Sequence, residues 1–264
     1  MTDDDRPGSA VLAHDDVGTG PAVLLIHAGI ADRRMWSDHT QALAQAGRRV
    51  IAVDLPGYGD SPAPASVDEP WEDVIAVLDG LGITRAAVVG VSFGGAVALR
   101  VAAAAPARVS ALVVVSAPVD AVAPSPSLQA AWAAEEVALE RGDVDAAVTA
   151  VVDAWTLPGA PAALRERVAA MQRRAFAVQL TAPDTGEAPD PLDEELGALA
   201  AISGLPILFA VGEHDRSDFH DGAALLAAAV PGSRLAVIPG AGHLAPLEAP
   251  GAFRDLLLDV LGRT

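Results

Sequence analysis

The stretch that decides the fold runs from Ala86 to Gly95 and reads AAVVGVSFGG, within a chain of 264 residues. Its first six residues are apolar or small, as in a buried strand, and an alanine-rich helical pattern begins at Phe93. Between them, Gly90-Val91-Ser92-Phe93-Gly94 matches G-x-S-x-G, the pattern of a sharp turn from strand to helix. Such a turn leaves little space beside the serine, and the glycines provide it. The sequence therefore predicts an exposed Ser92 hydroxyl at a helix N-terminus; the alternative is a glycine-rich turn with an incidental serine.

Outward from this stretch, short apolar runs alternate with amphipathic ones, which is typical of a mostly parallel sheet flanked by helices. A hairpin arm around Val11, with a turn at Gly18 and Gly20, is expected before the first buried strand. We expect strands at 22–26, 49–53, 86–91, 109–115, 207–211 and 235–238, and helices at 36–46, 67–81, 93–105, 223–229 and 253–261.

The strand pattern stops for about ninety residues after Val115, which is the main organisational feature of the chain. This segment contains helical patterns at 128–140, at 144–155 with Asp143 as N-cap, and at 162–180, followed by a loop at 181–191. We expect a core domain of residues 1–117 and 205–264 and a helical cap of residues 118–204 inserted between late strands. Such a cap would lie over the carboxyl ends of the strands, where open sheets bind ligands.

Composition excludes several kinds of chemistry. The 17 basic residues are all arginine, 35 residues are acidic, cysteine is absent, and the net charge is −18. Thiol nucleophiles, Schiff-base amines, phosphate-loop lysines, disulfides and thiolate zinc sites are therefore impossible. The charge argues against binding to nucleic acids or anionic membranes. MTDDDRPGSA lacks the features of a signal peptide, and no apolar window is long enough to span a membrane, so we expect a cytoplasmic protein.

A serine nucleophile needs a base, and without lysine or cysteine that base must be histidine. His243 follows the last predicted strand, at the same edge of the sheet as Ser92. His14, His39 and His220 fit surface positions better, and His27 fits a structural anchor at a strand end.

The base in turn needs a carboxylate to orient it. Asp215 follows the penultimate strand, and the chain order Ser92, Asp215, His243 is the one that accompanies this turn. Asp120, which follows the strand after Ser92, is the competing candidate. We prefer Asp215 because its loop is shorter.

Two further features bear on a site at this edge. Donors for an oxyanion are expected from the backbone N–H groups of Phe93 and Gly29, with Ile30 as the alternative to Gly29. A second interpretation reads the histidines and aspartates at 214, 215, 218, 220 and 221 as a metal site. Their spacing matches no known metal pattern, so neither a metal nor a cofactor is expected.

Five ordered segments resemble the α/β-hydrolase fold superfamily over nearly the whole chain. They are LLIHAG at 24–29, DLPGYGDS at 54–61, GVSFGG at 90–95, VGEHD at 211–215 and GAGHLAPLEAP at 240–250. The resemblance implies a catalytic Ser92, Asp215 and His243, with a helical lid on the inserted segment. Ala28 departs from the glycine that is common there. Epoxide hydrolases and haloalkane dehalogenases of this fold use an aspartate nucleophile, so Ser92 argues against both.

Within the superfamily, DRRMW at 32–36 and GDVDAAVTAVVDAW at 142–155 are similar to the enol-lactone hydrolase and small esterase branch. The similarity implies a serine hydrolase that cleaves a small ester or lactone through an acyl enzyme. Carbon-carbon bond hydrolysis or perhydrolysis by the same three residues, and a non-catalytic binding protein, are the alternatives. Oligomeric state is not predicted. Trp132, Trp155 and Phe176 could line a pocket, but aromatic residues at helical spacing more often belong to the core. Arg33 and Arg34 fit surface charges better than a carboxylate site.

Overall fold

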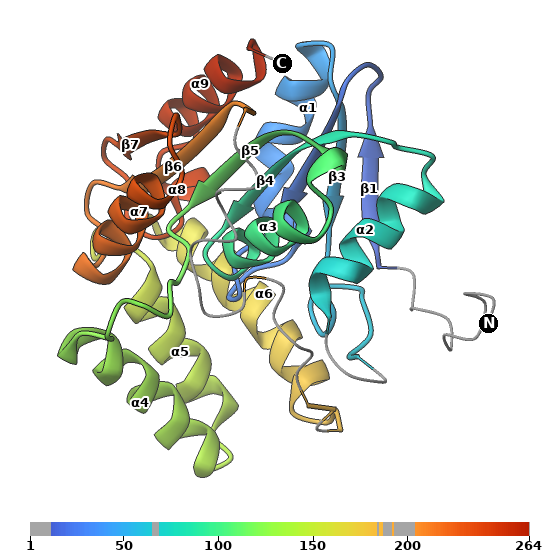
Figure 1. Cartoon of the computed structure of the whole chain (residues 1–264). Coiled ribbons are helices and arrows are strands. Elements are labelled where there is room, and N and C mark those ends of the chain that lie inside the picture. The colour runs from blue at the N-terminus through green and yellow to red at the C-terminus, as the bar shows by residue number, and fades with distance from the viewer. Residues whose placement is uncertain (1–11, 65–68, 184, 187–191, 193–203, 264) are drawn as a thin grey trace.

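The central feature of the computed structural model is a twisted sheet (Figure 1). The structure describes residues 12–64, 69–183, 185, 186, 192 and 204–263. Within these residues seven strands pair in the order β1-β3-β2-β4-β5-β6-β7, and all are parallel to their neighbours except β1. The strands are β1 His14–Val17, β2 Ala22–Ile26, β3 Arg49–Val53, β4 Ala86–Val91, β5 Val109–Val115, β6 Ile207–Gly212 and β7 Arg234–Ile238.

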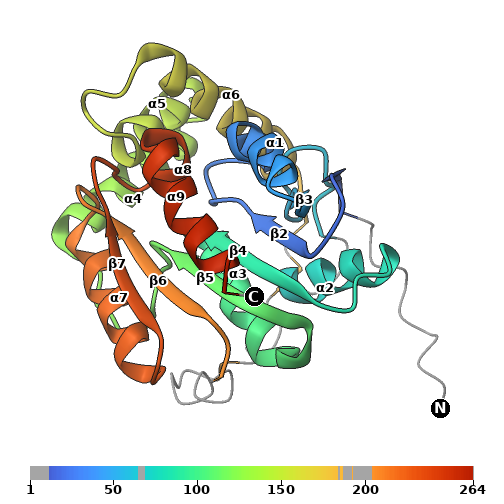
Figure 2. The ribbon, with the colours of Figure 1, turned by 90° about the horizontal axis from the view of Figure 1, so that it is seen from above.

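Helices cover both faces of the sheet, which explains why its central strands are apolar throughout (Figure 2). In β2, Val23 and Leu25 belong to the core cluster under α1 and α9, whereas Leu24 and Ile26 belong to the cluster under α2 and α3. The helices of the core are η1 Arg33–Trp36, α1 Ser37–Gln45, α2 Pro70–Gly80, α3 Phe93–Ala104, η2 Pro106–Arg108, α7 Ser217–Ala229, α8 Ala245–Glu248 and α9 Pro250–Leu261. The mostly parallel sheet flanked by helices that the sequence predicts is confirmed.

Among the described residues between β5 and β6, three helices lie together at one end of the sheet (Figure 1): α4 Pro126–Glu140, α5 Val144–Trp155 and α6 Ala162–Gln179. Asp143 caps α5, as expected, because its side chain accepts a hydrogen bond from the Ala146 amide. On α6, Arg174 pairs with Asp60 beyond β3, which places this helix over the carboxyl end of that strand. Much of the predicted loop at 181–191, and part of the cap range 118–204, lie outside the described residues.

Three expectations about local structure need correction. The predicted hairpin is wrong, because β1 pairs antiparallel with β3 rather than with β2, the next strand in the chain. Val11, around which its first arm was expected, lies outside the described residues. Helix α7 begins at Ser217, six residues earlier than its pattern suggested, and α8 was not predicted. Helix α2 begins at Pro70, and the expected start at Val67 lies outside the described residues.

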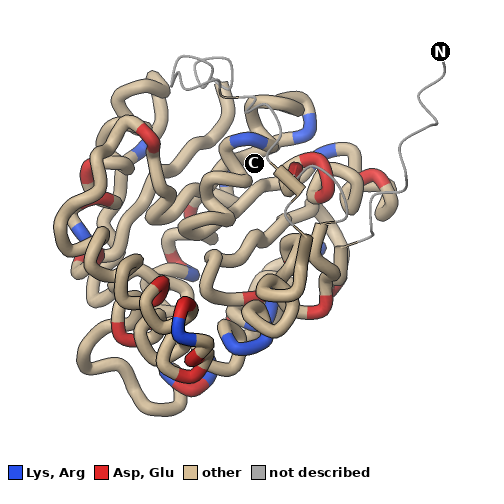
Figure 3. Tube along the Cα trace, turned by 90° about the horizontal axis from the view of Figure 1, so that it is seen from below, with Lys and Arg blue, Asp and Glu red and all other residues tan. Residues whose placement is uncertain are grey.

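Acidic and basic positions are interspersed along the trace (Figure 3). Several arginines pair with aspartates across the surface, among them Arg49 with Asp16 and Arg234 with Asp259. None of the helices in the described part of the chain combines the length and apolar character needed to cross a membrane.

Candidate active site

The turn between β4 and α3 holds Ser92 in a strained backbone conformation, with φ 54° and ψ −121°. The space beside it admits only glycine. A Cβ atom on Gly90 would lie 2.0 Å from the Gly94 carbonyl oxygen, and one on Gly94 would lie 2.3 Å from the His27 carbonyl oxygen. Because these obstacles are backbone atoms, they cannot move aside. The chain is therefore forced to present Ser92 at the N-terminus of α3, as the G-x-S-x-G pattern predicts.

The structure brings Ser92, His243 and Asp215 together from three separate loops. The Nε2 atom of His243 lies 2.9 Å from the Ser92 Oγ atom. The Nδ1 atom of the same ring lies 3.1 Å from each carboxylate oxygen of Asp215. Asp120, the competing candidate, is exposed and forms no hydrogen bond with His243 in the described structure. The imidazole thus has a hydroxyl on one nitrogen and a carboxylate on the other.

Asp215 is buried but remains suited to the ionised form. Burial raises the pKa of this carboxyl, yet the charge of His243 and hydrogen bonds from His243 and the Arg216 amide outweigh it. The net result is a pKa below the usual value for aspartate. An ionised carboxylate at this position favours the tautomer with a proton on Nδ1, which leaves Nε2 free to accept the Ser92 proton.

Two aromatic rings hold the His243 imidazole. Trp155, at the end of α5, has its ring centroid 4.5 Å from that of His243, and Phe219, on α7, lies at 4.3 Å. The Arg216 guanidinium stacks on Trp155 and donates a hydrogen bond to the Ala154 carbonyl. His243 is therefore buried, with 6% of its surface exposed. The sequence did not single out Phe219, because the contact joins residues on different elements.

In the described part of the chain, the other two aromatic residues considered for a pocket have no ring contact with His243, and Phe176 lies in the core, the position favoured for such residues. Trp132, on α4, is 49% exposed. Phe176, on α6, is buried in the core cluster that also contains Trp36 and Phe253. Of the three aromatic candidates on α4, α5 and α6, Trp155 is the one with a ring contact with His243.

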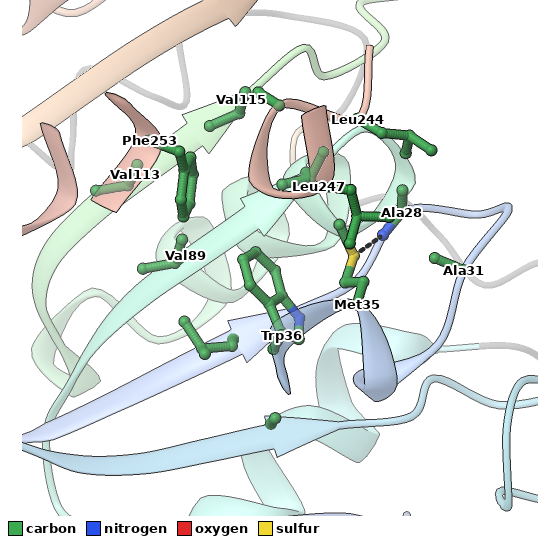
Figure 4. Packing of buried hydrophobic residues seen from close by; sticks show 14 of the residues in the cluster. Ala28, Ala31, Met35, Trp36, Val89, Val113, Val115, Leu244, Leu247 and Phe253 are labelled. Atoms are coloured by element: carbon green, nitrogen blue, oxygen red, sulfur yellow. Dashed lines mark hydrogen bonds between the residues drawn. The ribbon is translucent and has the colours of Figure 1, made fainter. Parts of the chain in front are cut away.

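The loop after β2 lies beside the Ser92 turn. A Cβ atom on Gly29 would be 3.3 Å from the Phe93 Cβ and 3.5 Å from the Tyr58 hydroxyl. Within the described residues, the amides of Gly29 and Phe93 donate no hydrogen bond, whereas the Ala28 amide points at the Met35 sulfur, 3.4 Å away (Figure 4). Both predicted donors are thus available to a ligand. The sequence did not predict that Tyr58 lies beside Gly29, although the motif DLPGYGDS at 54–61, which contains Tyr58, was recognised.

The interpretation of His27 as a structural anchor agrees with its hydrogen bonds. Its Nε2 atom accepts a hydrogen bond from the Leu55 amide, and its Nδ1 atom lies 2.8 Å from the Ala28 carbonyl oxygen. Burial lowers the pKa of His27, so the ring is held neutral between β2 and the loop after β3. This arrangement fixes the start of the loop that carries Gly29.

Other residues expected on the surface are in fact buried or paired. His39 is fully buried, and its Nε2 atom bonds to the Pro246 carbonyl. Arg33 forms ion pairs with the buried Asp54 and with Asp15 and Asp60. It therefore has a structural role. Arg34 pairs with Asp32. His14, on β1, and His220, on α7, are half-buried.

The residues of the alternative metal cluster have separate partners. Asp215 faces His243, and Asp218 accepts hydrogen bonds from the amide and hydroxyl of Ser125 at the start of α4. In the residues that the structure describes, no group of three or more histidine, aspartate or glutamate side chains is placed to hold a metal ion.

Comparison with known proteins assigns this architecture to a family. The model of the alpha/beta hydrolase fold matches residues 21–250. The chain therefore belongs to the alpha/beta hydrolase fold family.

Proteins with similar sequences include several that are named as hydrolases. The chain is 30% identical to "Putative carbamate hydrolase RutD" of Variovorax paradoxus over 92% of each chain. It is 37% identical to "Bifunctional epoxide hydrolase 2" of Sus scrofa over 108 residues, which are 39% of this chain and 20% of that one. The chain thus spans only about a fifth to a quarter of the length of the first curated relatives that it matches.

Solved structures give a similar picture. An esterase from Thermogutta terrifontis superimposes with a TM-score of 0.76 at 26% identity, covering 96% of this chain and 93% of that one. Est816, described as an N-acyl homoserine lactone degrading enzyme, superimposes with a TM-score of 0.75 at 25% identity, covering 94% and 96%.

Proposed function

We propose that the protein is a serine hydrolase that cleaves a small ester or lactone through Ser92, His243 and Asp215. The observation that carries the proposal is the continuous contact from hydroxyl to imidazole to carboxylate, at 2.9 Å and 3.1 Å. A hydroxyl held in this way is the arrangement that activates serine for acyl transfer. The esterase and the lactone-degrading enzyme among the structural relatives support the substrate class.

The mechanism follows from the positions of these groups. His243 takes the Ser92 proton through Nε2 as the oxygen attacks the substrate carbonyl, and Asp215 stabilises the resulting imidazolium. The amides of Phe93 and Gly29 stabilise the oxyanion, with Ile30 as the alternative to Gly29. His243 then protonates the leaving group, and a water molecule activated by the same nitrogen hydrolyses the acyl enzyme. This sequence of steps needs no cofactor.

We further propose that residues 118–204 act as a cap domain over this site. Trp155 supports that role, because it reaches from α5 to the His243 ring. The expected occupant is a small-molecule ester or lactone, the substrate class supported by the esterase and the lactone-degrading enzyme among the structural relatives.

The test is reaction with a fluorophosphonate probe, in parallel with turnover of short p-nitrophenyl esters, lactones, thioesters and diketones. Wild type should be labelled, and Ser92→Ala should lose labelling and at least about 10³-fold in kcat/KM while staying folded. Ser37→Ala, at an exposed serine, is the matched control and should behave as wild type. Turnover of diketones alone would favour carbon-carbon hydrolysis. Folded wild type that neither labels nor turns over any substrate would favour a binding protein.

A further inference from the structure

Glu248 is a half-buried carboxylate that the mechanism above does not use. It is the last residue of the short helix α8 and lies five residues after His243. Its Oε2 atom accepts hydrogen bonds from the amides of Gly242, at 2.8 Å, and Leu244, at 3.2 Å. Its Oε1 atom accepts one from the Leu157 amide at 2.7 Å. One side chain therefore satisfies three backbone donors from two distant segments.

The first two donors flank His243 in the chain. Gly242 and Leu244 are its neighbours in the chain, so a single oxygen atom fixes the peptide groups on both sides of the imidazole. Leu244 is itself buried in the core with Leu247 and Ala28 (Figure 4). The backbone of His243 is thus held from the protein interior and by Glu248.

The third donor belongs to the segment that follows α5. Leu157 lies two residues after Trp155, the residue whose ring packs on His243. Packing here is close, because a Cβ atom on Gly242 would lie 2.9 Å from the Leu157 Cδ2 atom and 3.0 Å from the Glu248 Oε2 atom. The end of α5 and the histidine loop therefore meet at one carboxylate.

We propose that Glu248 is a positioning residue that couples the cap to His243, holding the imidazole and the Trp155 segment in one fixed relation. The inference rests on the proposed function, since it gives His243 its role. It implies that the imidazole reaches its working position only when the end of α5 is docked. A misplacement of about 1 Å in such a group can reduce the rate about 10²-fold.

Burial and hydrogen bonding act on the pKa of this carboxylate in opposite directions. Burial raises the pKa of Glu248, and the three amide donors and the charge of His243 oppose that rise without cancelling it. Ionised Glu248 is therefore less favourable in the folded protein than in water.

The experiment compares Glu248→Gln and Glu248→Ala with Glu213→Gln. Glu213 is the matched control, because its exposed side chain accepts a hydrogen bond from the Gly240 amide on the same loop. The measurements are the rate constant for fluorophosphonate labelling, kcat and KM for p-nitrophenyl acetate, and the thermal midpoint. Glutamine keeps the volume of glutamate but offers one acceptor oxygen, so it cannot serve both segments. We expect folded Glu248→Gln to lose about 10²-fold in labelling rate and kcat with little change in KM.

Glu213→Gln should retain wild-type rates. Folded Glu248→Gln that labels at the wild-type rate would overturn the proposal, and so would a Glu248→Gln that does not fold, since either result makes the residue purely structural. Failure of wild type to label or turn over would instead count against the proposed function. The two failures are therefore distinguishable.

A double variant with Trp155→Ala tests the coupling itself. If Glu248 acts through the docked end of α5, the double variant should lose little more activity than the more damaged single variant. If the two fold-losses multiply, the cap and the histidine loop act independently and the coupling is refuted.

Discussion

The two sides of the candidate active site are held in place by different means. On the nucleophile side, backbone atoms lie so close to Gly90 and Gly94 that neither position has space for a side chain. On the histidine side, His243 is held by the side chains of Asp215, Phe219 and Trp155, and these come from separate elements. The nucleophile turn is thus fixed by backbone atoms of the turn itself and of the end of β2, whereas the histidine position depends on side-chain contacts, one of them from α5. Substitutions should therefore act differently on the two sides.

The largest effect is expected at the acid on the histidine side. Asp215→Asn keeps the shape of the side chain but removes the charge that fixes the His243 tautomer, so kcat should fall about 10⁴-fold. The protein should stay folded, which circular dichroism would confirm. Steady-state hydrolysis of p-nitrophenyl acetate measures the loss.

Asp120→Asn is the matched control for this prediction. Asp120 is exposed and follows β5, so its variant should retain wild-type kcat. If Asp120→Asn were inactive and Asp215→Asn active, the acid would be assigned wrongly, and the contact seen between Asp215 and His243 would be structural only.

Substitutions in the Ser92 turn should lower the free energy of unfolding and not only the reaction rate. In Gly94→Ala the new Cβ atom would lie 2.3 Å from the His27 carbonyl oxygen and 2.5 Å from that of Ile26. Since neither carbonyl can move without disturbing β2, we expect a loss of about 3 kcal/mol in the free energy of unfolding. Urea denaturation followed by tryptophan fluorescence measures this change.

Gly251→Ala is the control, because this glycine lies in α9 with nothing within 4 Å of the added Cβ. Alanine is the better helix former, so this variant should be unchanged or slightly more stable. Equal destabilisation by both substitutions would show that the nucleophile turn is no more constrained than an ordinary helix.

The same contrast explains what the sequence could predict. The bounds of β2, β3, β4 and β5 were predicted because each is a short apolar run between turn residues. The Ser92 turn was predicted because the G-x-S-x-G pattern that marks it lies within five consecutive residues, although part of the constraint on Gly94 comes from the end of β2. Ser92, Asp215 and His243 are brought together as expected, because each follows a parallel strand and so reaches the same edge of the sheet.

What the sequence did not predict depends on contacts between distant residues. His39 and Arg33 were read as surface residues, yet one is covered by the α8 segment and the other by the acidic side chains around Asp54. The partner of β1 is also non-local, since pairing with β3 rather than β2 leaves no mark in the sequence of β1. Helix α8 has four residues, too few to show a helical period.

A smaller effect is expected at the cap side of His243. Trp155→Ala removes the ring that packs on the imidazole, and aromatic pairs contribute about 0.5–1.5 kcal/mol beyond their buried area. We expect a loss of about tenfold in kcat/KM, which the same esterase assay would measure. Trp132→Ala, at the half-exposed tryptophan on α4, should change kcat/KM less than about twofold. Equal losses in the two variants would mean that the cap acts as a whole and not through Trp155.

The smallest effect is the pH dependence of stability from two carboxylates near His243. The pKa of Asp215 lies below its usual 3.8 in the folded protein, so its contribution is present above that pH and is lost as the pH falls through the lowered pKa. The pKa of Glu248 lies above its usual 4.5, so its contribution is complete below pH 4.5 and is lost as the pH rises through the raised pKa.

The free energies of unfolding of wild type, Asp215→Asn and Glu248→Gln, measured in urea from pH 3 to pH 7, test these opposite signs. With rising pH, the advantage of wild type over Asp215→Asn should grow at the acid end of the range. Its advantage over Glu248→Gln should shrink above about pH 4.5. If both differences changed in the same direction, Glu248 would be a second ordinary ion-pair partner of His243. The carboxylate that joins the cap to the histidine loop would then carry no cost in stability, and the distinction between the two acids would be lost.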